Sequence, residues 1–513
     1  MEAEIEMEKY LIKCRTLILS DLGILITLAL IKLIIHILTN GQYGFHRDEL
    51  GFLEDARYLA WGYVSYPPFT VFIARLALVL FGPSLTGLRF FAALGQSIAM
   101  VFVGLIARDL GGSRRAQLVA ALAAAIAGIS LSSSSLFNYN GFDVLWWVLV
   151  AYLVVRLLKS ENPRYWLGIG AVIGLGMLTK YTIAFYVAGL MVGILLTESR
   201  RYLTSLWLWA GVGLSVLIFL PNLIWQVQNN FIYLHFLTYI HARDIQIGRT
   251  QGFLVGQLYV STNPVTVPLW IAGLYFFFFT PAGRRYRLLG WMAAIAFLLF
   301  LVFQGRDYYT GPIYPTLMAA GAVYGEQWLA SLSSARARTV TVTTWWALAI
   351  GGLLTAALVL PLAPVNSIWW QVDRAINADP REEIGWPDLV KTVAGIYNTI
   401  PAAEKPQVGI LAYSSEVGAI NLFGPPYALP HAIGAMNSDW LRGYGNPPPQ
   451  TLIVIGWSQE KVDTYFQTCI LAGKVTNSYG VQNEDTMYRP DIFLCRGLRE
   501  GWAEFWNQIQ SFG

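Results

Sequence analysis

Long apolar runs recur along almost the whole of this chain. Of its 513 residues, 55% are hydrophobic and only 13% are charged, and the mean hydropathy is +0.49. An ordinary soluble domain carries about 25% charged residues, and a helix needs about 20 apolar residues to cross the hydrocarbon of a bilayer. Repeated runs of that length predict a polytopic α-helical membrane protein.

Hydropathy predicts about eleven membrane spans. The apolar stretch 165–197 is too long for one span, and we divide it at Lys180, because a lysine in the middle of the bilayer is costly. The first span is expected to stay as an anchor, since no small-residue cleavage site follows it. The predicted spans lie near residues 17–38, 86–107, 116–134, 142–158, 165–179, 181–197, 206–224, 264–280, 288–303, 313–330 and 340–363.

Short basic segments between the spans predict the orientation of the chain. Every cluster of Lys and Arg falls on the side of the N-terminus, and the positive-inside rule makes that side cytoplasmic. The first loop at 40–85 and the tail from about 365 are then extracytoplasmic. The clusters are Lys9, Lys13 and Arg15; Arg108, Arg114 and Arg115; Lys159 and Arg164; Arg200 and Arg201; Arg284, Arg285 and Arg287; and Arg336 and Arg338.

The tail differs in character from the rest of the chain. The segments "PQVGILAYS" and "QTLIVIGWS" indicate buried strands, and "SEVGAINLF" and "EKVDTYFQTCILA" indicate helices. Alternating strands and helices predict a small α/β domain. We therefore expect a transmembrane domain at 1–364 and an extracytoplasmic α/β domain at 365–513.

The chain has three cysteines, too few for a disulfide framework. Cys14 lies near the start of the first span, whereas Cys469 and Cys495 lie in the tail. An extracytoplasmic tail would permit a disulfide between the latter two. Two buried free thiols are the alternative, and the sequence leaves both open.

The first loop is unusually acidic. It begins with "GFHRDELGFLEDARYLAWGYVSYPPFT" from Gly44, in which the adjacent carboxylates Asp48 and Glu49 follow the first span closely. A helix over 48–61 would lie along the membrane surface with one face in the lipid boundary. Its charges either pair with Arg47 and Arg57 in solvent or include a desolvated catalytic base. On a helical wheel Leu50, Leu53, Ala60 and Trp61 share one face, and Asp48, Phe52, Asp55 and Leu59 the other.

Isolated charges at other span ends are candidates for an anion site. Lys180 in "GLGMLTKYT" is the only charge between two apolar segments, and Arg306 in "QGRDYYTGPIYP" adjoins Tyr308 and Tyr309. Both suit a phosphate group. The alternatives are a lysine that reaches the interface for Lys180 and an interfacial aromatic belt around Arg306.

Two further loop motifs have structural alternatives. Tyr66-Pro67-Pro68 is either a stiff turn or part of a pocket. Asp143, at the end of the polar loop "SSSSLFNYNGFD", is either a helix cap or a pocket residue.

Other chemistries have no support in the sequence. It lacks a glycine-rich phosphate loop, His-x-x-x-His or Cys-x-x-Cys metal spacing and a Gly-x-Ser-x-Gly elbow. We therefore expect no cytoplasmic nucleotide site, no required cofactor and no supported divalent metal. The net charge of +4 comes from basic residues in short loops and indicates no nucleic-acid partner.

The segment "FHRDELGFLEDARYLAWGYVSYPPFT" resembles the first extracytoplasmic loop of bacterial GT-C glycosyltransferases. These are related to protein O-mannosyltransferases and to lipid A aminoarabinose transferases. The resemblance continues in order through "FNYNGFDVLWW", "GLGMLTKYT", "PNLIWQ", "NPVTVPLW" and "YYTGPIYPTLMAAGA", so it covers most of residues 40–325. In the tail, "SEVGAINLFG", "MNSDWLRG" and "FLCRG" resemble the C-terminal domain of the bacterial glycosyltransferase family 39 branch.

The resemblance implies an enzyme of the bacterial inner membrane that moves a sugar from a polyprenyl phosphate to an extracytoplasmic lipid, glycan or protein. It departs from the aminoarabinose transferases, which have a lysine in the segment matching Tyr66-Pro67-Pro68, so their acceptor is not carried over. The implied roles are Asp48 as general base beside Glu49; Lys180, Arg306 and Tyr309 as phosphate ligands; and His46, Arg57, Tyr66, Asp143 and Tyr308 as pocket residues.

One base and a good leaving group suffice for a single inverting displacement. The alternative function is a transporter or flippase of a lipid-linked sugar. Transporters usually show related halves or matching broken helices, and neither is visible in the sequence.

Overall fold

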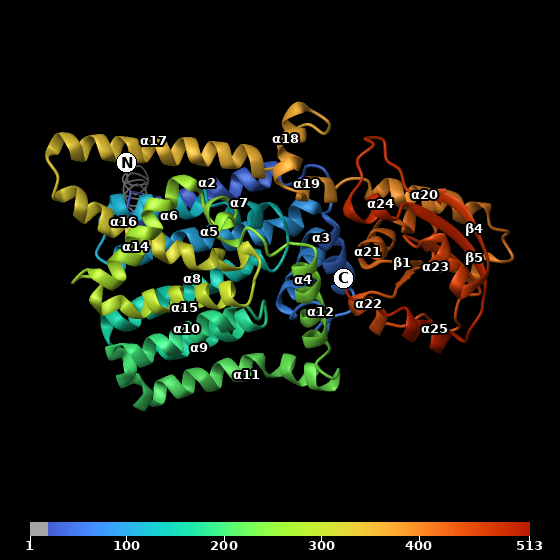
Figure 1. The fold of residues 1–513 in the computed structure, drawn as a ribbon, viewed down its shortest axis with the longest axis horizontal. Coiled ribbons are helices and arrows are strands. Elements are labelled where there is room, and N and C mark those ends of the chain that lie inside the picture. Colours follow the sequence, from blue (N-terminus) through green and yellow to red (C-terminus); the bar gives the residue numbers. More distant parts are fainter. Residues whose placement is uncertain (1–18) are drawn as a thin grey trace, which may run out of the picture. The chain divides into compact units, whose positions relative to one another are not determined.

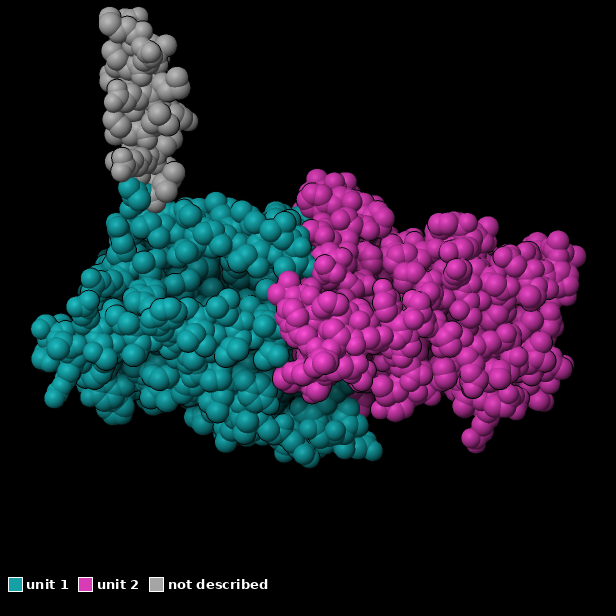
Figure 2. Space-filling model, turned by 90° about the horizontal axis from the view of Figure 1, so that it is seen from above, with its two compact units in different colours: residues 1–40, 89–223, 244–360 teal, residues 41–88, 224–243, 361–513 magenta. Residues whose placement is uncertain are grey.

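The computed structural model describes residues 19–513, which form two compact units (Figure 2). Unit 1 consists of the chain up to Asn40 with 89–223 and 244–360, and unit 2 of 41–88, 224–243 and 361–513. The predicted basic cluster Lys9, Lys13 and Arg15 and also Cys14 lie outside the described residues. Contacts thus group the first loop with the tail, whereas the predicted domain division assigned that loop to the transmembrane part.

Unit 1 is helical. Its helices and 3-10 turns are α2 (Asp21–Thr39), α5 (Leu85–Asp109), α6 (Arg114–Ala125), α7 (Gly128–Ser135), α8 (Asn140–Ser160), α9 (Tyr165–Met177), α10 (Ile183–Leu196), η1 (Glu198–Thr204), α11 (Leu206–Gln228), α13 (Phe253–Tyr259), η2 (Pro264–Thr266), α14 (Val267–Phe279), η3 (Arg284–Tyr286), α15 (Arg287–Val302), η4 (Asp307–Ile313), α16 (Tyr314–Ala330) and α17 (Ser334–Val359).

Within residues 19–513, six helices are long and apolar enough to cross a membrane: α2, α5, α8, α11, Arg284–Val302 and α17. The number rises to nine if each of three bent pairs is one span, namely α6 with α7, α10 with η1, and α13 with Pro264–Phe279. Every predicted span overlaps a helix, but those at 165–179 and 313–330 fall on α9 and α16, which have only 13 and 17 residues. A multi-pass helical protein is confirmed, and the count of about eleven stays a prediction.

Small residues let the helices of unit 1 approach closely. α14 packs along α16, and α10 along α15 (Figure 1). A Cβ atom on Gly273 would lie 2.0 Å from the carbonyl oxygen of Leu317, and one on Gly321 would lie 1.8 Å from that of Leu269. Such backbone contact between α14 and α16 is typical of helices that associate in lipid, where burial of apolar surface gives little driving force.

Unit 2 combines helices with one sheet. Its helices and 3-10 turns are α3 (Arg47–Asp55), α4 (Phe69–Phe81), most of α12 (Ile232–Gln246), α18 (Ile368–Ile376), α19 (Asp379–Glu382), α20 (Trp386–Thr399), η5 (Lys405–Gln407), α21 (Ser414–Phe423), η6 (Pro425–Tyr427), α22 (Asn437–Leu441), α23 (Gln459–Tyr465), α24 (Glu484–Tyr488) and α25 (Trp502–Gln508).

The sheet lies in the C-terminal part of the chain, drawn red in Figure 1, and its strand order is β2-β1-β3-β5-β4. β1 pairs in parallel with β2 and β3, and β5 pairs antiparallel with β3 and β4. The strands are β1 (Val408–Ala412), β2 (Ala432–Gly434), β3 (Thr451–Ile455), β4 (Phe466–Lys474) and β5 (Asp491–Leu498).

The tail predictions are confirmed for β1, β3 and α21, but the predicted helix over 460–472 is wrong beyond Tyr465. The chain continues as the edge strand β4 from Phe466, paired with β5. Cys469 lies directly opposite Cys495 in this pair, and the two form a disulfide. The disulfide alternative is therefore confirmed, and the cross-strand bond explains why this segment adopts the strand rather than the helix.

Candidate active site

The first turn of α3 carries the predicted catalytic pair, and its two carboxylates differ sharply in environment. Nδ1 of His46 accepts the backbone N–H of Asp48 at 3.1 Å, and the carboxylate of Glu49 accepts the backbone N–H of His46 at 2.8 Å. These reciprocal bonds form a capping box that starts the helix. Glu49 is fully buried, whereas the side chain of Asp48 is 56% exposed.

Asp48 has only loose charged neighbours in the described chain. Its carboxylate lies 3.8 Å from Nε of Arg47 and 4.0 Å from Nδ1 of His46. Arg47 is engaged elsewhere, since its Nη1 lies 2.7 Å from the carboxylate of Glu484. The Asp48 carboxylate is thus accessible to solvent, so the expectation of a desolvated carboxylate is wrong for Asp48, and of the pair only Glu49 is buried.

The predicted surface helix over 48–61 is wrong in both length and setting. α3 ends at Asp55, and its Leu50 and Phe52 are as buried as its Glu54. It packs against α21, where a Cβ atom on Gly418 would lie 2.4 Å from the carbonyl oxygen of Leu50. The apolar side chains of α3 are therefore covered by protein and form no open face for lipid, while Asp48 in its first turn stays exposed.

Buried charges at the end of α3 explain this packing. Nη2 of Arg442 binds the Asp55 carboxylate, and Nη1 binds that of Asp439 and lies 4.0 Å from that of Glu54. The hydroxyl of Tyr66 donates to the second oxygen of Asp55 at 2.5 Å. The predicted pocket residue Tyr66 thus belongs to a cluster of one guanidinium and three carboxylates, defined here as the Arg442 cluster.

Burial controls the protonation of this cluster. Removal from water raises the pKa of Asp439 to about 7, although the neighbouring guanidinium of Arg442 opposes the rise. Burial also raises the pKa of Asp55, again against Arg442. The predicted pocket residue Arg57 lies beside the cluster, with Nη2 donating to the carbonyl oxygen of Asn421 at 2.8 Å and Nε lying 3.5 Å from Glu54.

Lys180 lies between α9 and α10 in unit 1, in an aromatic setting. Its side chain is 7% exposed, and Nζ donates to Oδ1 of Asn140 at 2.9 Å. Nζ also lies 5.0, 5.2 and 4.3 Å from the ring centroids of Tyr139, Tyr308 and Tyr309. Tyrosine rings attract a cation through their negative faces, so these rings and Asn140 form a setting that suits an ammonium group.

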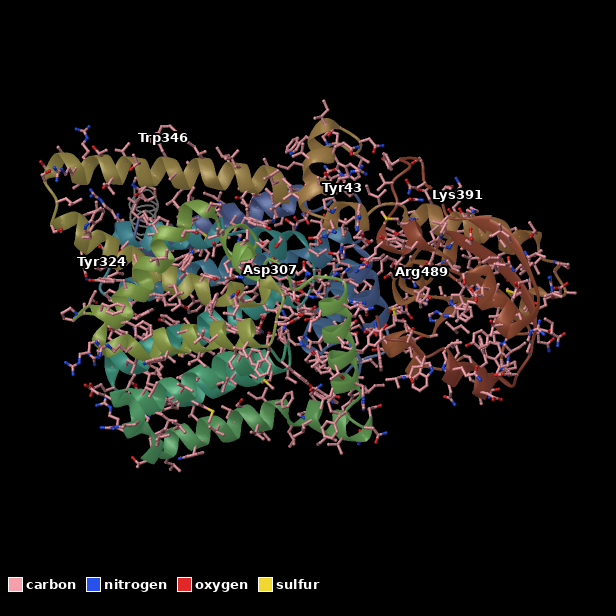
Figure 3. The ribbon with its side chains drawn as sticks, in the orientation of Figure 1. Tyr43, Asp307, Tyr324, Trp346, Lys391 and Arg489 are labelled. Atoms are coloured by element: carbon pink, nitrogen blue, oxygen red, sulfur yellow. A yellow bond between two sulfur atoms is a disulfide. The ribbon has the colours of Figure 1, made fainter. Side chains whose placement is uncertain are left out.

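Arg306 reaches the same tyrosines from another loop. Its Nε donates to the buried Asp244 carboxylate at 2.6 Å, and its Nη1 donates to the hydroxyl of Tyr308 at 3.3 Å. Asp307, labelled in Figure 3, begins η4 directly after Arg306. Gln257 and Ser261 bond the carbonyl oxygen of Asp307 at 3.1 and 2.9 Å, which holds this loop against α13. Two cations far apart in sequence therefore meet around Tyr308.

Asp143 is not a helix cap. α8 begins at Asn140, and Asp143 lies within its first turn. Its carboxylate accepts Nε1 of Trp147 at 2.9 Å and the hydroxyl of Thr182 at 3.4 Å, and its charge acts on Lys180. It thus balances the buried ammonium group from the adjacent helix.

The predicted residues divide between the units. His46, Asp48, Glu49, Arg57 and Tyr66 belong to unit 2, and Asp143, Lys180, Arg306, Tyr308 and Tyr309 to unit 1. The predicted approach of Asp48 to Lys180 and Arg306 stays a prediction. Sequence reasoning missed Asn140, Asp244 and the Arg442–Asp439 partners of α3. Among residues 19–513, no three His, Cys, Asp or Glu side chains are grouped as metal ligands.

Comparisons with known proteins give a family match over part of the chain and a fold over most of it. The family described as dolichyl-phosphate-mannose-protein mannosyltransferase matches residues 65–225. Lipid A galacturonosyltransferase RgtD of Rhizobium johnstonii is 25% identical over 261 residues, which are 48% of this chain and 54% of the relative. The match thus spans about half the length of that relative.

The crystal structure of ArnT from Cupriavidus metallidurans bound to undecaprenyl phosphate has a TM-score of 0.56 at 16% identity, covering 92% of this chain and 97% of that one. The apo structure of the same protein has a TM-score of 0.55 with the same coverage. At this identity the likeness shows the fold. The matched segment and the fold agree with the resemblance seen in the sequence: the chain has an ArnT-like GT-C fold, and its residues 65–225 match the mannosyltransferase family.

Proposed function

We propose that the chain transfers a sugar from a polyprenyl-phosphate donor to an acceptor outside the cytoplasm. The observation that carries the proposal is the convergence of the buried Lys180 and the partly buried Arg306 on Tyr308, since two cations at one place suit an anionic headgroup. ArnT from Cupriavidus metallidurans, which has a similar fold, was crystallised with undecaprenyl phosphate, a lipid with such a headgroup.

The cations would act on the leaving group. Negative charge grows on the phosphate as the bond from the anomeric carbon to the phosphate oxygen breaks. Groups that already face this position stabilise the transition state more than the ground state. Asp244 holds Arg306, and Asn140 holds Lys180, so neither cation needs to reorganise during the reaction.

Asp48 is the proposed general base, and the exposure of its carboxylate distinguishes it from Glu49. The Glu49 carboxylate is buried in the capping box, whereas Asp48 is half exposed with no close ion pair among the described residues. The acceptor hydroxyl would attack the anomeric carbon, lose its proton to Asp48 and displace the polyprenyl phosphate with the bonding electron pair. A single displacement of this kind inverts the anomeric centre. Tyr309, His46, Arg57, Tyr66, Asp143 and Tyr308 would support the two sides of the site.

The proposal includes an orientation with the N-terminus in the cytoplasm of a bacterial inner membrane. The Cys469–Cys495 disulfide supports it, because disulfides persist in oxidising compartments. The acceptor is a lipid, glycan or protein that the oxidising side of the membrane presents.

The experiment incubates purified protein in vesicles with polyprenyl phosphates that carry labelled sugars and measures released polyprenyl phosphate. We expect release with wild type and with Asp388→Asn, and none above background with Asp48→Asn. Asp388 is the matched control, as it also lies in the first turn of a helix of unit 2. Movement of intact donor across the bilayer without release would support the flippase alternative instead.

A further inference from the structure

The end of α3 holds two carboxylates that need a partner. Glu54 and Asp55 are 3% and 5% exposed, and a buried carboxylate without a partner is strongly unfavourable. Arg442, which directly follows α22, is the partner of Asp55 and lies 4.0 Å from Glu54. Glu54 also has His431 at 3.3 Å and Arg57 at 3.5 Å. An ion pair between Asp55 and Arg442, which are 387 residues apart in sequence, therefore joins the first loop to the C-terminal part of unit 2.

Arg442 and its partner Asp439 have further contacts, from Tyr58 in the first loop and from Ser414 in the C-terminal part of unit 2. The guanidinium of Arg442 lies 4.5 Å from the ring centroid of Tyr58, and Asp439 accepts the hydroxyl of Ser414 at 2.7 Å. Ser414 is the first residue of α21, directly after β1. The Ser438 hydroxyl also accepts the backbone N–H of Val64 at 3.1 Å. Arg442 is thus held by the sheet region while it holds the loop.

We propose that Arg442 is a positioning residue for sugar transfer: through Asp55 and Glu54 it holds α3, and therefore Asp48, in place on the C-terminal domain. Asp48 lies seven residues before Asp55 on the same short helix, about 10 Å along its axis, so a shift at one end moves the other. This inference rests on the proposed function.

The charged composition of the Arg442 cluster suggests that Arg442 serves to orient α3 rather than to add to the stability of the fold. One guanidinium serves three carboxylates, and a well-packed apolar group of similar volume is often as stable as a buried ion pair. What apolar packing lacks is the planar fork, which binds two carboxylates in a defined direction. Asp439 and Asp55 take separate nitrogens of that fork, so Arg442 determines the direction in which α3 leaves the sheet region.

The test compares Arg442→Met with Arg442→Lys and with the control Arg496→Met. Arg496 lies in β5 of the same unit, and its guanidinium binds Glu404 at 2.9 Å rather than any residue of the first loop. Two quantities are measured on folded full-length protein: the kcat and KM for donor, and hydrogen exchange of the backbone amides of residues 47–55.

We expect Arg442→Met to lower kcat on the order of 100-fold, the scale of a displacement of about 1 Å at a reacting group. The KM for donor should change little, because the proposed phosphate ligands lie in unit 1. Exchange within α3 should rise. Arg442→Lys should recover part of kcat, because it keeps the charge but not the fork, and Arg496→Met should match wild type in both measurements.

Unchanged kcat or unchanged exchange in α3 for folded Arg442→Met would overturn the positioning role. If Arg442→Met does not fold, Arg442→Lys and Asp439→Asn decide by the same two measurements. A wild-type protein that releases no polyprenyl phosphate from any donor would overturn the proposed function and the catalytic consequence of Arg442. The exchange of α3 separates the two failures, because it is measured without substrate.

Discussion

Replacing Lys180 by methionine is expected to weaken the binding of a polyprenyl phosphate by about 10- to 150-fold. A hydrogen bond to a charged group contributes about 1.5–3 kcal/mol, and about 1.4 kcal/mol corresponds to a factor of ten in affinity. Lys180 donates one of its three N–H groups to Asn140. The other two are free to bind phosphate without loss of that bond, so the full contribution of one charged hydrogen bond is available.

The assay titrates wild type and Lys180→Met in lipid nanodiscs with a short polyprenyl phosphate at constant ionic strength, because screening changes with salt. Lys159→Met is the control. It removes the same charge from the last turn of α8, where Lys159 binds Asp109 at 2.9 Å, whereas Lys180 contacts the first turn of that helix. Equal affinity of wild type and Lys180→Met would refute the reasoning. An equal loss in Lys159→Met would show that net charge, rather than a site, binds the lipid.

Three further predictions follow from the same contacts. Asp48→Asn should lower transfer by about 10²- to 10⁴-fold, the usual contribution of a general base, with donor affinity unchanged; a fully active variant would remove Asp48 from the mechanism. Burial raises the pKa of Asp439 to about 7, so between about pH 4 and 7 the native state keeps a proton that the unfolded chain has lost, and stability falls as pH rises. The melting temperature should therefore drop less from pH 5 to pH 8 in Asp439→Asn than in wild type, and equal drops would contradict this. Removing the Cys469–Cys495 disulfide, which closes a loop of 26 residues, should cost roughly 3 kcal/mol of stability in chemical denaturation; no loss in the double serine variant would refute it.

The parts of the fold that the sequence predicted well depend on local patterns. A span is a long uninterrupted apolar run, and β1 and β3 are short buried runs bounded by turn residues, so each is visible in its own window. β4 was missed because its pairing with β5 lies outside that window: the residues opposite it, such as Cys495, begin 17 residues after β4 ends.

Candidate site residues could be predicted from the sequence where a charged residue stood out against an apolar segment. Lys180 was the only charge between two apolar segments, and Arg306 adjoined two tyrosines. The structure places both cations near Tyr308, and their role as phosphate ligands stays a prediction. Their partners Asn140 and Asp244 were hidden, since an amide in a polar loop and an acid in a long connecting segment have ordinary structural explanations.

The setting of α3 could not be predicted for a related reason. Its helical wheel has one wholly apolar face, with Leu50 and Leu53, opposite a face that carries Asp48 and Asp55, and such an apolar face suggested a surface helix. Glu54 and Asp55 are buried where α21 packs on α3 and where Arg442 meets them from the far end of the chain. Periodicity reports which residues share a face, but it does not report what covers that face.

The central claim is that Asp48 and the two cations act on one lipid headgroup. A structure of the protein with bound polyprenyl phosphate tests it most directly. The account predicts the phosphate in contact with Lys180 and Arg306, and the Asp48 carboxylate facing it across a space that a sugar and an acceptor hydroxyl fill. A phosphate bound away from both cations, or an Asp48 carboxylate directed into solvent on another side of the protein, would contradict it.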